Sequence, residues 1–196
     1  MKKYNYNKIK REVERIVKQA NDNRKNQFTD TVWQYHIQPV VKHSLILGKK
    51  LKADMEILEL SALLHDYASL VDKKLYKEHH LHGARLAGEI LSNLNYPEEK
   101  IKHIKDCILS HRGSLNIKKK TIEAKILASA DAMAHITELV DMFYLTFGVY
   151  SLKTTAGAKW LKGKLIRDWQ KIMPEGKKII KEEYNSAIKL LDKAIK

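Results

Sequence analysis

The run ILELSALLHDYASL, residues 57–70, constrains the fold of this chain more than any other stretch of its sequence. It is almost wholly apolar until its last turns, where His65 and Asp66 stand next to each other. A helix without a polar face is normally buried in the protein interior. We therefore expect this segment to form a central core helix, with its two titratable side chains at the end where the core stops.

Few residues in this sequence break helices. The chain has eight glycines and three prolines among 196 residues, and no segment shows the apolar-polar alternation that is typical of a half-buried strand. Pro97 and Pro174 suit the first turns of two helices, and Gly148 suits the end of another. We therefore predict an all-α fold, an orthogonal helical bundle with a loop at 21–26. The expected helices span about residues 4–20, 31–51, 55–70, 80–95, 97–112, 121–147, 156–172 and 174–195.

Length and cysteine content limit the class of protein. A chain of 196 residues suits one domain that can bury a sizeable core. Its single cysteine, Cys107, excludes an internal disulfide, and its first residues do not pair a charged start with an apolar stretch as a signal peptide does. The longest apolar runs fall well short of the ~18 residues that a membrane span needs. We expect a soluble, cytoplasmic protein with no membrane partner.

The net charge of +14 is concentrated at the two ends of the chain. Residues 1–26 carry nine basic and three acidic side chains, residues 27–149 carry 16 and 15, and residues 150–196 carry 12 and five. The excess therefore lies where a catalytic core needs it least. Lysine-rich helix faces in water explain it better than a surface for a polyanion, so a nucleic-acid partner is an alternative that the charge does not favour.

Histidine and aspartate are the residues that point to chemistry. The chain has nine histidines, and neutral imidazoles combined with carboxylates are common ligands of divalent metals. Adjacent side chains on a helix leave its axis about 100° apart, so His65 and Asp66 reach one ion only if it lies between their directions. This is easiest near the end of a helix. A buried Asp66 also requires a metal or a strong hydrogen bond to compensate for the loss of water.

Five segments extend this pattern, each on its own predicted helix. In chain order they are WQYHIQPVV, LLHDYA, EHHLHGARLAGEIL, ILSHRGS and ILASADAMAHI. Their order and spacing resemble the HD-domain metal-dependent phosphohydrolases, whose pattern is H…HD…D, with two further histidines in members that hold two metals. The resemblance covers about residues 30–140 and implies an HD core there. The basic helix in 1–26 and the helices of 150–196 are then expected to pack on that core as parts of one domain.

The resemblance implies that His36, His65, Asp66 and Asp131 bind a divalent metal, of the iron, manganese, magnesium, zinc, cobalt or nickel type. His36 lies 29 residues before His65, which is the familiar spacing. His43 lies only 22 residues before it and is expected to be a packed or supporting histidine. The small residues around Asp131 allow helices to approach closely around a shared ion.

The same resemblance implies a second ion, or a phosphate contact, at two further histidines. His79 lies four residues before Gly83 and matches the family best, while His80 is the alternate. His111 is the other expected ligand. His135 follows Asp131 by four residues and shares its helix face, so it either orients that carboxylate, meets the substrate or packs between helices.

The activity that the resemblance implies is hydrolysis of a phosphate ester of a nucleotide or a related small molecule. The metal supplies activated water, Asp66 is central to the catalytic site, and Arg112 neutralises charge on the phosphate, with Lys73 and Lys74 as further cations near the site. The sequence HDYA is similar to family members that cleave dinucleoside polyphosphates, although Ser69 stands where they have lysine. No GYP follows His111, which counts against the cyclic dinucleotide group.

Two other functions stay open at this point. One is a nucleotide- or nucleic-acid-binding protein that keeps the HD scaffold without hydrolysis, and the other is a di-iron oxygenase of HD type, since the same ligands serve it. A homo-oligomer also remains open. Trp160 and Trp169 lie beyond the resemblance, and their spacing of nine puts them on opposite sides of a helix. We expect one of them to seal the C-terminal helices onto the core.

Overall fold

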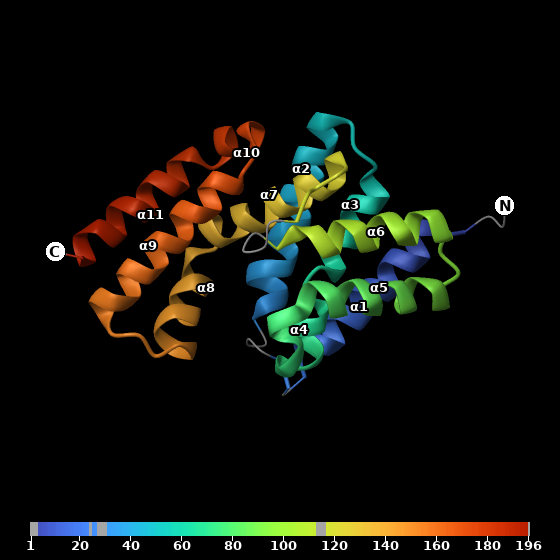
Figure 1. The fold of residues 1–196 in the computed structure, drawn as a ribbon, viewed down its shortest axis with the longest axis horizontal. Helices are drawn as coiled ribbons and strands as arrows, with labels where there is room; N and C mark the ends of the chain where they lie inside the picture. The colour runs from blue at the N-terminus through green and yellow to red at the C-terminus, as the bar shows by residue number, and fades with distance from the viewer. Residues whose placement is uncertain (1–3, 24, 27–30, 113–116, 196) are drawn as a thin grey trace.

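The computed structural model describes residues 4–23, 25–26, 31–112 and 117–195. Every regular element in these ranges is helical, which confirms the all-α prediction (Figure 1). None of the described helices has the length and apolar character that crossing a membrane requires. The elements are α1 (Tyr6–Asn21), η1 (Trp33–Ile37, a π-helix), α2 (Gln38–Leu51), α3 (Met55–Leu64), α4 (Tyr67–Val71), η2 (Lys73–Glu78, a 3₁₀ helix), α5 (His79–Asn93), α6 (Glu98–His111), α7 (Ile122–Thr137), α8 (Leu139–Phe143), η3 (Tyr144–Val149, a π-helix), α9 (Thr154–Lys171), α10 (Pro174–Ile179) and α11 (Lys181–Ala194).

Helix α3 is the central core helix that its apolar sequence predicts. It begins at Asp54, whose side chain accepts hydrogen bonds from the backbone N–H groups of Glu56 and Ile57 and so satisfies two donors of the first turn. From Ile57 to Leu64 every residue is buried, and the helix packs against α1, α2, α6 and α7. Burial on all sides is the environment that suits a helix without a polar face.

The expected single helix over 55–70 is wrong, because α3 ends at Leu64 and α4 begins at Tyr67. At the junction, the ring of His65 bonds to the carbonyl oxygen of Ala62, one of the groups that a helix end leaves without a partner. Helix α5 crosses closely here, since a Cβ at Gly83 would lie 3.3 Å from the carbonyl oxygen of His65. At this interruption Nε2 of His65 lies 3.6 Å from Oδ2 of Asp66, so the two side chains face each other.

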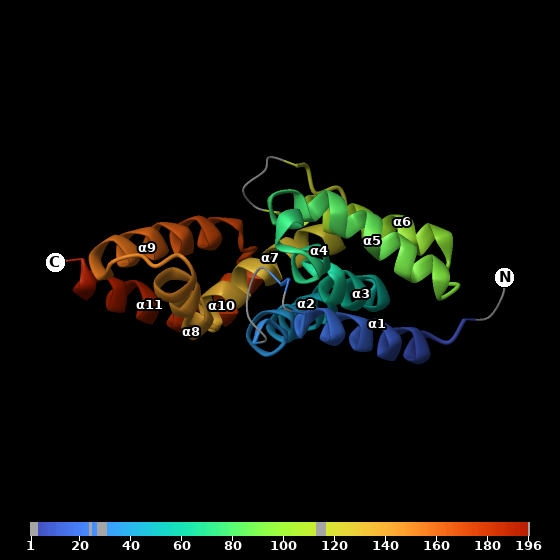
Figure 2. The ribbon, with the colours of Figure 1, turned by 90° about the horizontal axis from the view of Figure 1, so that it is seen from below.

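Two hydrophobic clusters hold the helices together. The first joins α1, α3, α5 and α6, and the second joins α7 to α9 and α11, with Leu47 of α2 and Leu58 of α3 contributing to it. Figure 2 shows α9 and α11 gathered at the end of the molecule opposite the N-terminus, with α7 leading from one group of helices to the other. A pocket forms where these two groups meet.

Two other expected helices are also divided in the structure. The helix predicted over 121–147 ends at Thr137, and α8 and η3 follow it after a break at Glu138. The helix predicted over 174–195 is interrupted at Ile180. Apolar spacing continues through both breaks, so periodicity alone does not reveal them. In the expected loop 21–26, Asn21 belongs to α1 and residue 24 lies outside the described residues.

The two tryptophans lie in different surroundings, as their spacing predicts. Trp169 stacks on Tyr184 of α11, with ring centroids 4.1 Å apart and planes 10° apart, and so joins α9 to α11. Trp160 meets the ring of Tyr150 edge-on and lines the pocket instead. The sealing contact is therefore between two C-terminal helices.

Candidate metal centre

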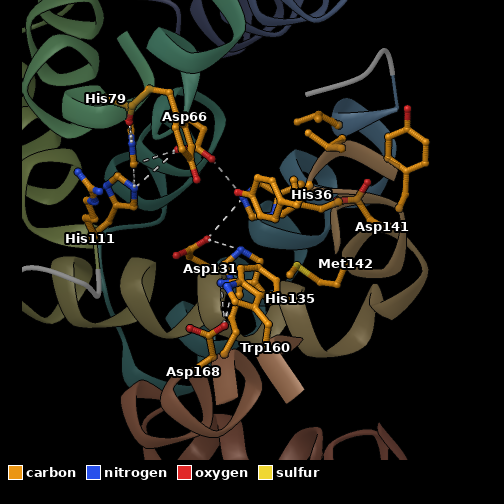
Figure 3. Close-up of a pocket in the computed structure, with 18 of the residues that line it drawn as sticks. His36, Asp66, His79, His111, Asp131, His135, Asp141, Met142, Trp160 and Asp168 are labelled. Atoms are coloured by element: carbon orange, nitrogen blue, oxygen red, sulfur yellow. Dashed lines mark hydrogen bonds and ion pairs between the residues drawn. The ribbon is translucent and has the colours of Figure 1, made fainter. Parts of the chain in front are cut away.

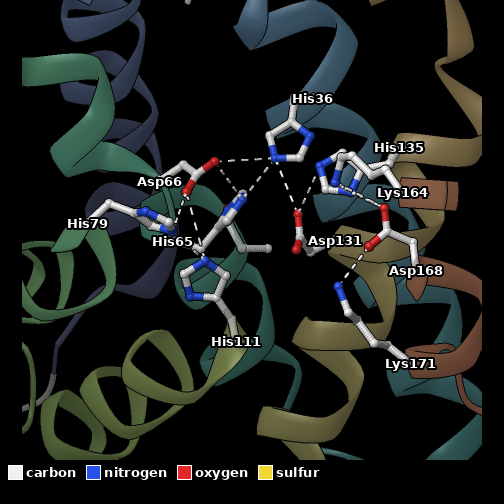
Figure 4. A network of polar contacts seen from close by, with 11 residues as sticks. His36, His65, Asp66, His79, His111, Asp131, His135, Lys164, Asp168 and Lys171 are labelled. Atoms are coloured by element: carbon white, nitrogen blue, oxygen red, sulfur yellow. Dashed lines mark hydrogen bonds and ion pairs between the residues drawn. The ribbon is translucent and has the colours of Figure 1, made fainter. Parts of the chain in front are cut away.

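All six side chains expected to bind metal lie close together (Figure 4). They come from η1, the α3–α4 junction, the start of α5, the end of α6 and the middle of α7. They form two groups, in each of which the atoms that could bind a metal lie within 4.8 Å of one another. One group is His36, His65 and Asp131, and the other is Asp66, His79 and His111.

Asp66 connects the two groups, because each of its carboxylate oxygens faces one of them. Its Oδ2 lies 3.4 Å from Nε2 of His36 and 3.6 Å from Nε2 of His65. Its Oδ1 lies 3.4 Å from Nε2 of His79 and 3.8 Å from Nε2 of His111. One carboxylate is thus positioned to be shared between two ions.

Backbone carbonyls fix the orientation of three of these histidines. His65, His79 and His111 each place Nδ1 against the carbonyl oxygen three residues earlier, at 2.7, 2.7 and 2.6 Å. A carbonyl only accepts, so Nδ1 carries the hydrogen, and Nε2 of the neutral ring keeps a free electron pair. Each of these histidines closes the end of a helical turn, and its outer hydrogen bond is of the kind that orients a histidine for a metal ion.

The resulting donor atoms fit a divalent cation. Nε2 of His36 lies 3.1 Å from Nε2 of His65, and Nε2 of His79 lies 3.3 Å from Nε2 of His111. Electron pairs that face each other at such distances repel unless a proton or a metal ion lies between them. Imidazole nitrogens with carboxylate oxygens suit zinc, iron, manganese and related ions.

The local electrostatics favour the protonation states that metal binding requires. Burial lowers the pKa of His65, and it lowers the pKa of His111 to about 4, so both rings are neutral near pH 7. Burial alone would raise the pKa of Asp66, but the surrounding histidines hold it well below the usual range. His36 differs, because its hydrogen bond to Asp66 and the charge of Asp131 outweigh burial and raise its pKa. A cation between these carboxylates would take the place of that proton.

The structure separates His79 from its alternate. Although both rings are largely buried, only His79 belongs to a group that could hold a metal. His80 lies beside it, with ring centroids 6.1 Å apart, and its Nδ1 has no hydrogen-bond partner. His43 is also outside the two groups, since its Nε2 lies 3.1 Å from Oγ1 of Thr137.

His135 lies beside the first group and contacts two carboxylates. Its ring stacks on that of His36, with centroids 5.2 Å apart and planes 13° apart. Its Nε2 lies 3.7 Å from Oδ1 of Asp131, and its Nδ1 lies 3.2 Å from Oδ2 of Asp168. His135 therefore links a candidate ligand on α7 to a buried carboxylate on α9.

The two groups open into a pocket of about 320 Å³ (Figure 3). Arg112 lines it and donates a hydrogen bond to the carbonyl oxygen of Lys77. Neither Lys73 nor Lys74 lines it. Residues 113–116, which follow Arg112, lie outside the described part of the chain. Aromatic rings form much of the remaining wall, namely those of Tyr76, Tyr144, Tyr150 and Trp160.

Four charged residues of the pocket wall were missed by reasoning from the sequence. Asp141 follows the break at Glu138, and Lys164, Asp168 and Lys171 come from α9. One signal was present, because Asp168 is the only acidic residue of α9 and has lysines four positions before it and three after it. Such pairs are usually solvated, so the spacing alone does not reveal a pocket.

Comparisons with known proteins agree with this geometry. Residues 33–136 match the family model for the HD domain. None of the curated proteins matches the chain. A crystal structure of a predicted HD superfamily hydrolase from an uncultured Thermotogales bacterium matches with a TM-score of 0.57 at 20% sequence identity. The match covers 82% of this chain and 87% of that chain, so the likeness extends beyond the matched domain at the level of fold.

Proposed function

The chain belongs to the HD-domain family, and from this premise we propose that it is a metal-dependent phosphohydrolase of small phosphate esters, with nucleotides as the first candidates. One observation carries the proposal. The free Nε2 atoms of His65, His79 and His111 converge with both oxygens of Asp66, and all of these residues except the fully buried His65 line the pocket. Donors held in this way suit divalent ions that act on phosphate.

The donor atoms are enough for two ions. His36, His65 and Asp131 would hold one, His79 and His111 would hold the second, and Asp66 would touch both. When bound, such ions lower the pKa of a water molecule towards neutrality and withdraw negative charge from phosphate oxygens.

The protein contributes orientation and charge. The three Nδ1–carbonyl hydrogen bonds prevent the histidine rings from turning, so the Nε2 atoms keep their direction when a substrate enters. Arg112 lines the same pocket as Asp66, His79 and His111. The N–H groups that it does not donate to Lys77 can bind phosphate oxygens there. Aromatic side chains of the pocket wall reduce the access of water to the reacting phosphate.

The size of the pocket supports a small substrate. Its volume of about 320 Å³ lies near the lower end of the range of roughly 300–1,000 Å³ that is typical of small-molecule sites. Aromatic rings beside a polar floor suit a molecule that has a phosphate at one end and a flat or apolar group at the other.

The test combines metal analysis with a hydrolysis panel. Purified protein is expected to contain a divalent metal and to release phosphate from at least one of p-nitrophenyl phosphate, bis(p-nitrophenyl) phosphate and a set of nucleotides. Asp66→Ala is expected to lose both metal and turnover, whereas Asp106→Ala, an exposed position on α6, is expected to keep both.

The same measurements address the alternative functions. A protein without metal that hydrolyses nothing in the panel would overturn the proposal. Salt-sensitive binding of DNA or RNA that survives Asp66→Ala would favour a binding protein. Bound iron with substrate-dependent consumption of oxygen would favour an oxygenase.

A further inference from the structure

A charged cluster on α9 faces the pocket and has no part in holding the metals. Its centre is Asp168, which is 1% exposed. Lys171 donates to its Oδ1 at 2.8 Å, and Lys164 donates to its Oδ2 at 3.0 Å. A buried carboxylate needs such partners, and here His135 and the two lysines together outweigh burial and hold the pKa of Asp168 far below the usual range.

The two lysines also have hydrogen-bond donors that Asp168 does not use. Each ammonium group has three N–H donors, and Asp168 takes one from each lysine. Lys164 Nζ lies 3.2 Å from Nδ1 of His135 as well, but that nitrogen also faces Oδ2 of Asp168 at 3.2 Å. The ammonium and a protonated Nδ1 both donate, and only the carboxylate accepts, so we assign the hydrogen bonds of both to Asp168. Both lysines line the pocket and keep part of their side chains exposed, 21% for Lys164 and 31% for Lys171, so their other donors can reach a ligand there.

The charges of the cluster do not cancel. Two ammonium groups surround one carboxylate, which leaves a net positive charge at this wall of the pocket. A third lysine lies nearby, since burial and the positive charge of Lys171 lower the pKa of Lys119. Positive charge that is partly shielded from water attracts anions more strongly than charge on an open surface.

The position of the cluster separates it from the metal ligands. Figure 4 shows Asp168 and Lys171 on the far side of Asp131 and His135 from Asp66, His79 and His111. The contacts follow the same order, from Asp131 to His135 at 3.7 Å and from His135 to Asp168 at 3.2 Å. An anion that the lysines bind is therefore a different group from a phosphate that lies between the two sets of ligands.

We infer that Lys164 and Lys171 form a second anion subsite, and that the substrate carries a second phosphate group next to the one that is hydrolysed. The inference rests on the proposed function, which puts the hydrolysed phosphate at the metal ligands. Two ammonium groups offer N–H donors to the oxygens of a phosphate group, and Asp168 keeps them side by side before the substrate arrives. Diphosphate and polyphosphate esters belong to this class, and a monophosphate, which lacks the group that the lysines hold, is expected to be hydrolysed more slowly.

The test compares two ligands that differ by one phosphonate group and cannot be hydrolysed. Binding of methylenediphosphonate and of methylphosphonate is measured by calorimetry, with Mn²⁺ in excess so that the ligand does not strip the protein of metal. The wild type is expected to bind the diphosphonate more tightly. Lys171→Gln and Lys164→Gln are each expected to lower the affinity for the diphosphonate about tenfold, which is the usual effect of losing a charged hydrogen bond. The affinity for methylphosphonate is expected to change less than about twofold.

Lys162→Gln is the matched control, because Lys162 lies on the same helix and pairs with Asp192 away from the pocket. Lys171→Arg keeps the charge and is expected to retain most of the affinity. Thermal unfolding of each variant shows whether the fold is intact. Equal affinity of the wild type for both ligands would overturn the inference, and so would an equal loss for both ligands in the lysine variants.

Hydrolysis of p-nitrophenyl phosphate separates this inference from the proposed function. If the lysine subsite alone is wrong, the wild type still hydrolyses the monoester and Asp66→Ala does not. If the proposed function is wrong, neither protein turns it over, and the two phosphonates still decide whether the lysines bind a second anion.

Discussion

The core of residues 33–136 and the C-terminal helices of residues 139–195 contribute to the same pocket in different ways. The core supplies all six candidate ligands, and three of them are oriented by bonds to the carbonyl three residues earlier. The C-terminal helices supply no candidate ligand among their described residues but contribute a network around one buried carboxylate, Asp168. Local chain geometry thus orients the ligands, whereas helix packing alone creates the wall opposite them.

The largest effect is expected in the core, at Asp131. Asp131→Asn removes the charge of a carboxylate that faces His36 at 3.4 Å, so an ion held by this group would lose an anionic ligand. Turnover is expected to fall roughly a thousandfold, more than the ~10–100-fold effect of an outer partner. Metal content, measured by mass spectrometry, is expected to fall with it. Full metal occupancy with wild-type turnover would remove Asp131 from the ligand set.

A smaller effect is expected at Asp168 in the C-terminal helices. Asp168→Asn leaves the metal ligands intact but releases Lys164, Lys171 and His135 from their shared partner. Turnover is expected to fall about 10–100-fold with unchanged metal content, because the residue supports others that contact the substrate. Asp192→Asn, which breaks a partly exposed pair between α9 and α11, is the control. Loss of metal in Asp168→Asn would contradict the conclusion that the core, and not the C-terminal helices, holds the metal.

His43 lies where the two regions meet and is expected to make stability depend on pH. Burial lowers its pKa in the folded protein to about 4, with a further contribution from Lys42 that Glu183 of α11 opposes. The unfolded chain, with a histidine pKa of about 6.5, binds the proton first as pH falls. The folded state therefore loses about 2 kcal/mol between pH 6.5 and pH 5 through this residue.

The variant His43→Gln isolates this contribution. It is expected to be about 1 kcal/mol less stable than the wild type at pH 7.5, because the bond to Thr137 is weakened. It is then expected to lose about 2 kcal/mol less than the wild type on going to pH 5. Urea unfolding at both pH values measures the difference. The same loss in both proteins would show that His43 does not carry the pH dependence.

The smallest effect is expected at Lys162. The side chain of its partner, Asp192, is 51% exposed. Exposed ion pairs contribute about 0–1 kcal/mol to the free energy of unfolding. Lys162→Gln is therefore expected to change the free energy of unfolding by less than about 1 kcal/mol. Lys171→Gln is expected to cost more, about 1–3 kcal/mol, because it removes a partner of a buried carboxylate. Equal losses would mean that burial of Asp168 does not strengthen its pairs.

The core could be predicted from the sequence further than the C-terminal helices. Apolar spacing indicates the helices, and the spacing of His36, the His65-Asp66 pair and Asp131 indicates which side chains meet. The break after Leu64 was not predictable from periodicity, because α4 continues the same apolar pattern. Nor does periodicity show the π-helix that carries His36. Such turns depend on contacts between helices as much as on the local sequence.

Asp168 shows most clearly what a sequence does not reveal. In the chain it reads as one acidic residue of a basic helix, with lysines at solvated spacing. Only the packing of α9 against α7 buries it and brings it to His135. The role of Trp160 is similar, because helical spacing separates it from Trp169 but does not show which of them faces a pocket.

Asp66, with one oxygen towards each group of ligands, has a consequence for how metal is taken up. Ions that share an anion affect each other's affinity reciprocally. A first ion would meet the full negative charge of the carboxylate, and a second ion would meet a charge that is already partly neutralised. A site that takes two ions would therefore fill in two unequal steps, and the supply of metal in the cell would set how much of the protein carries both.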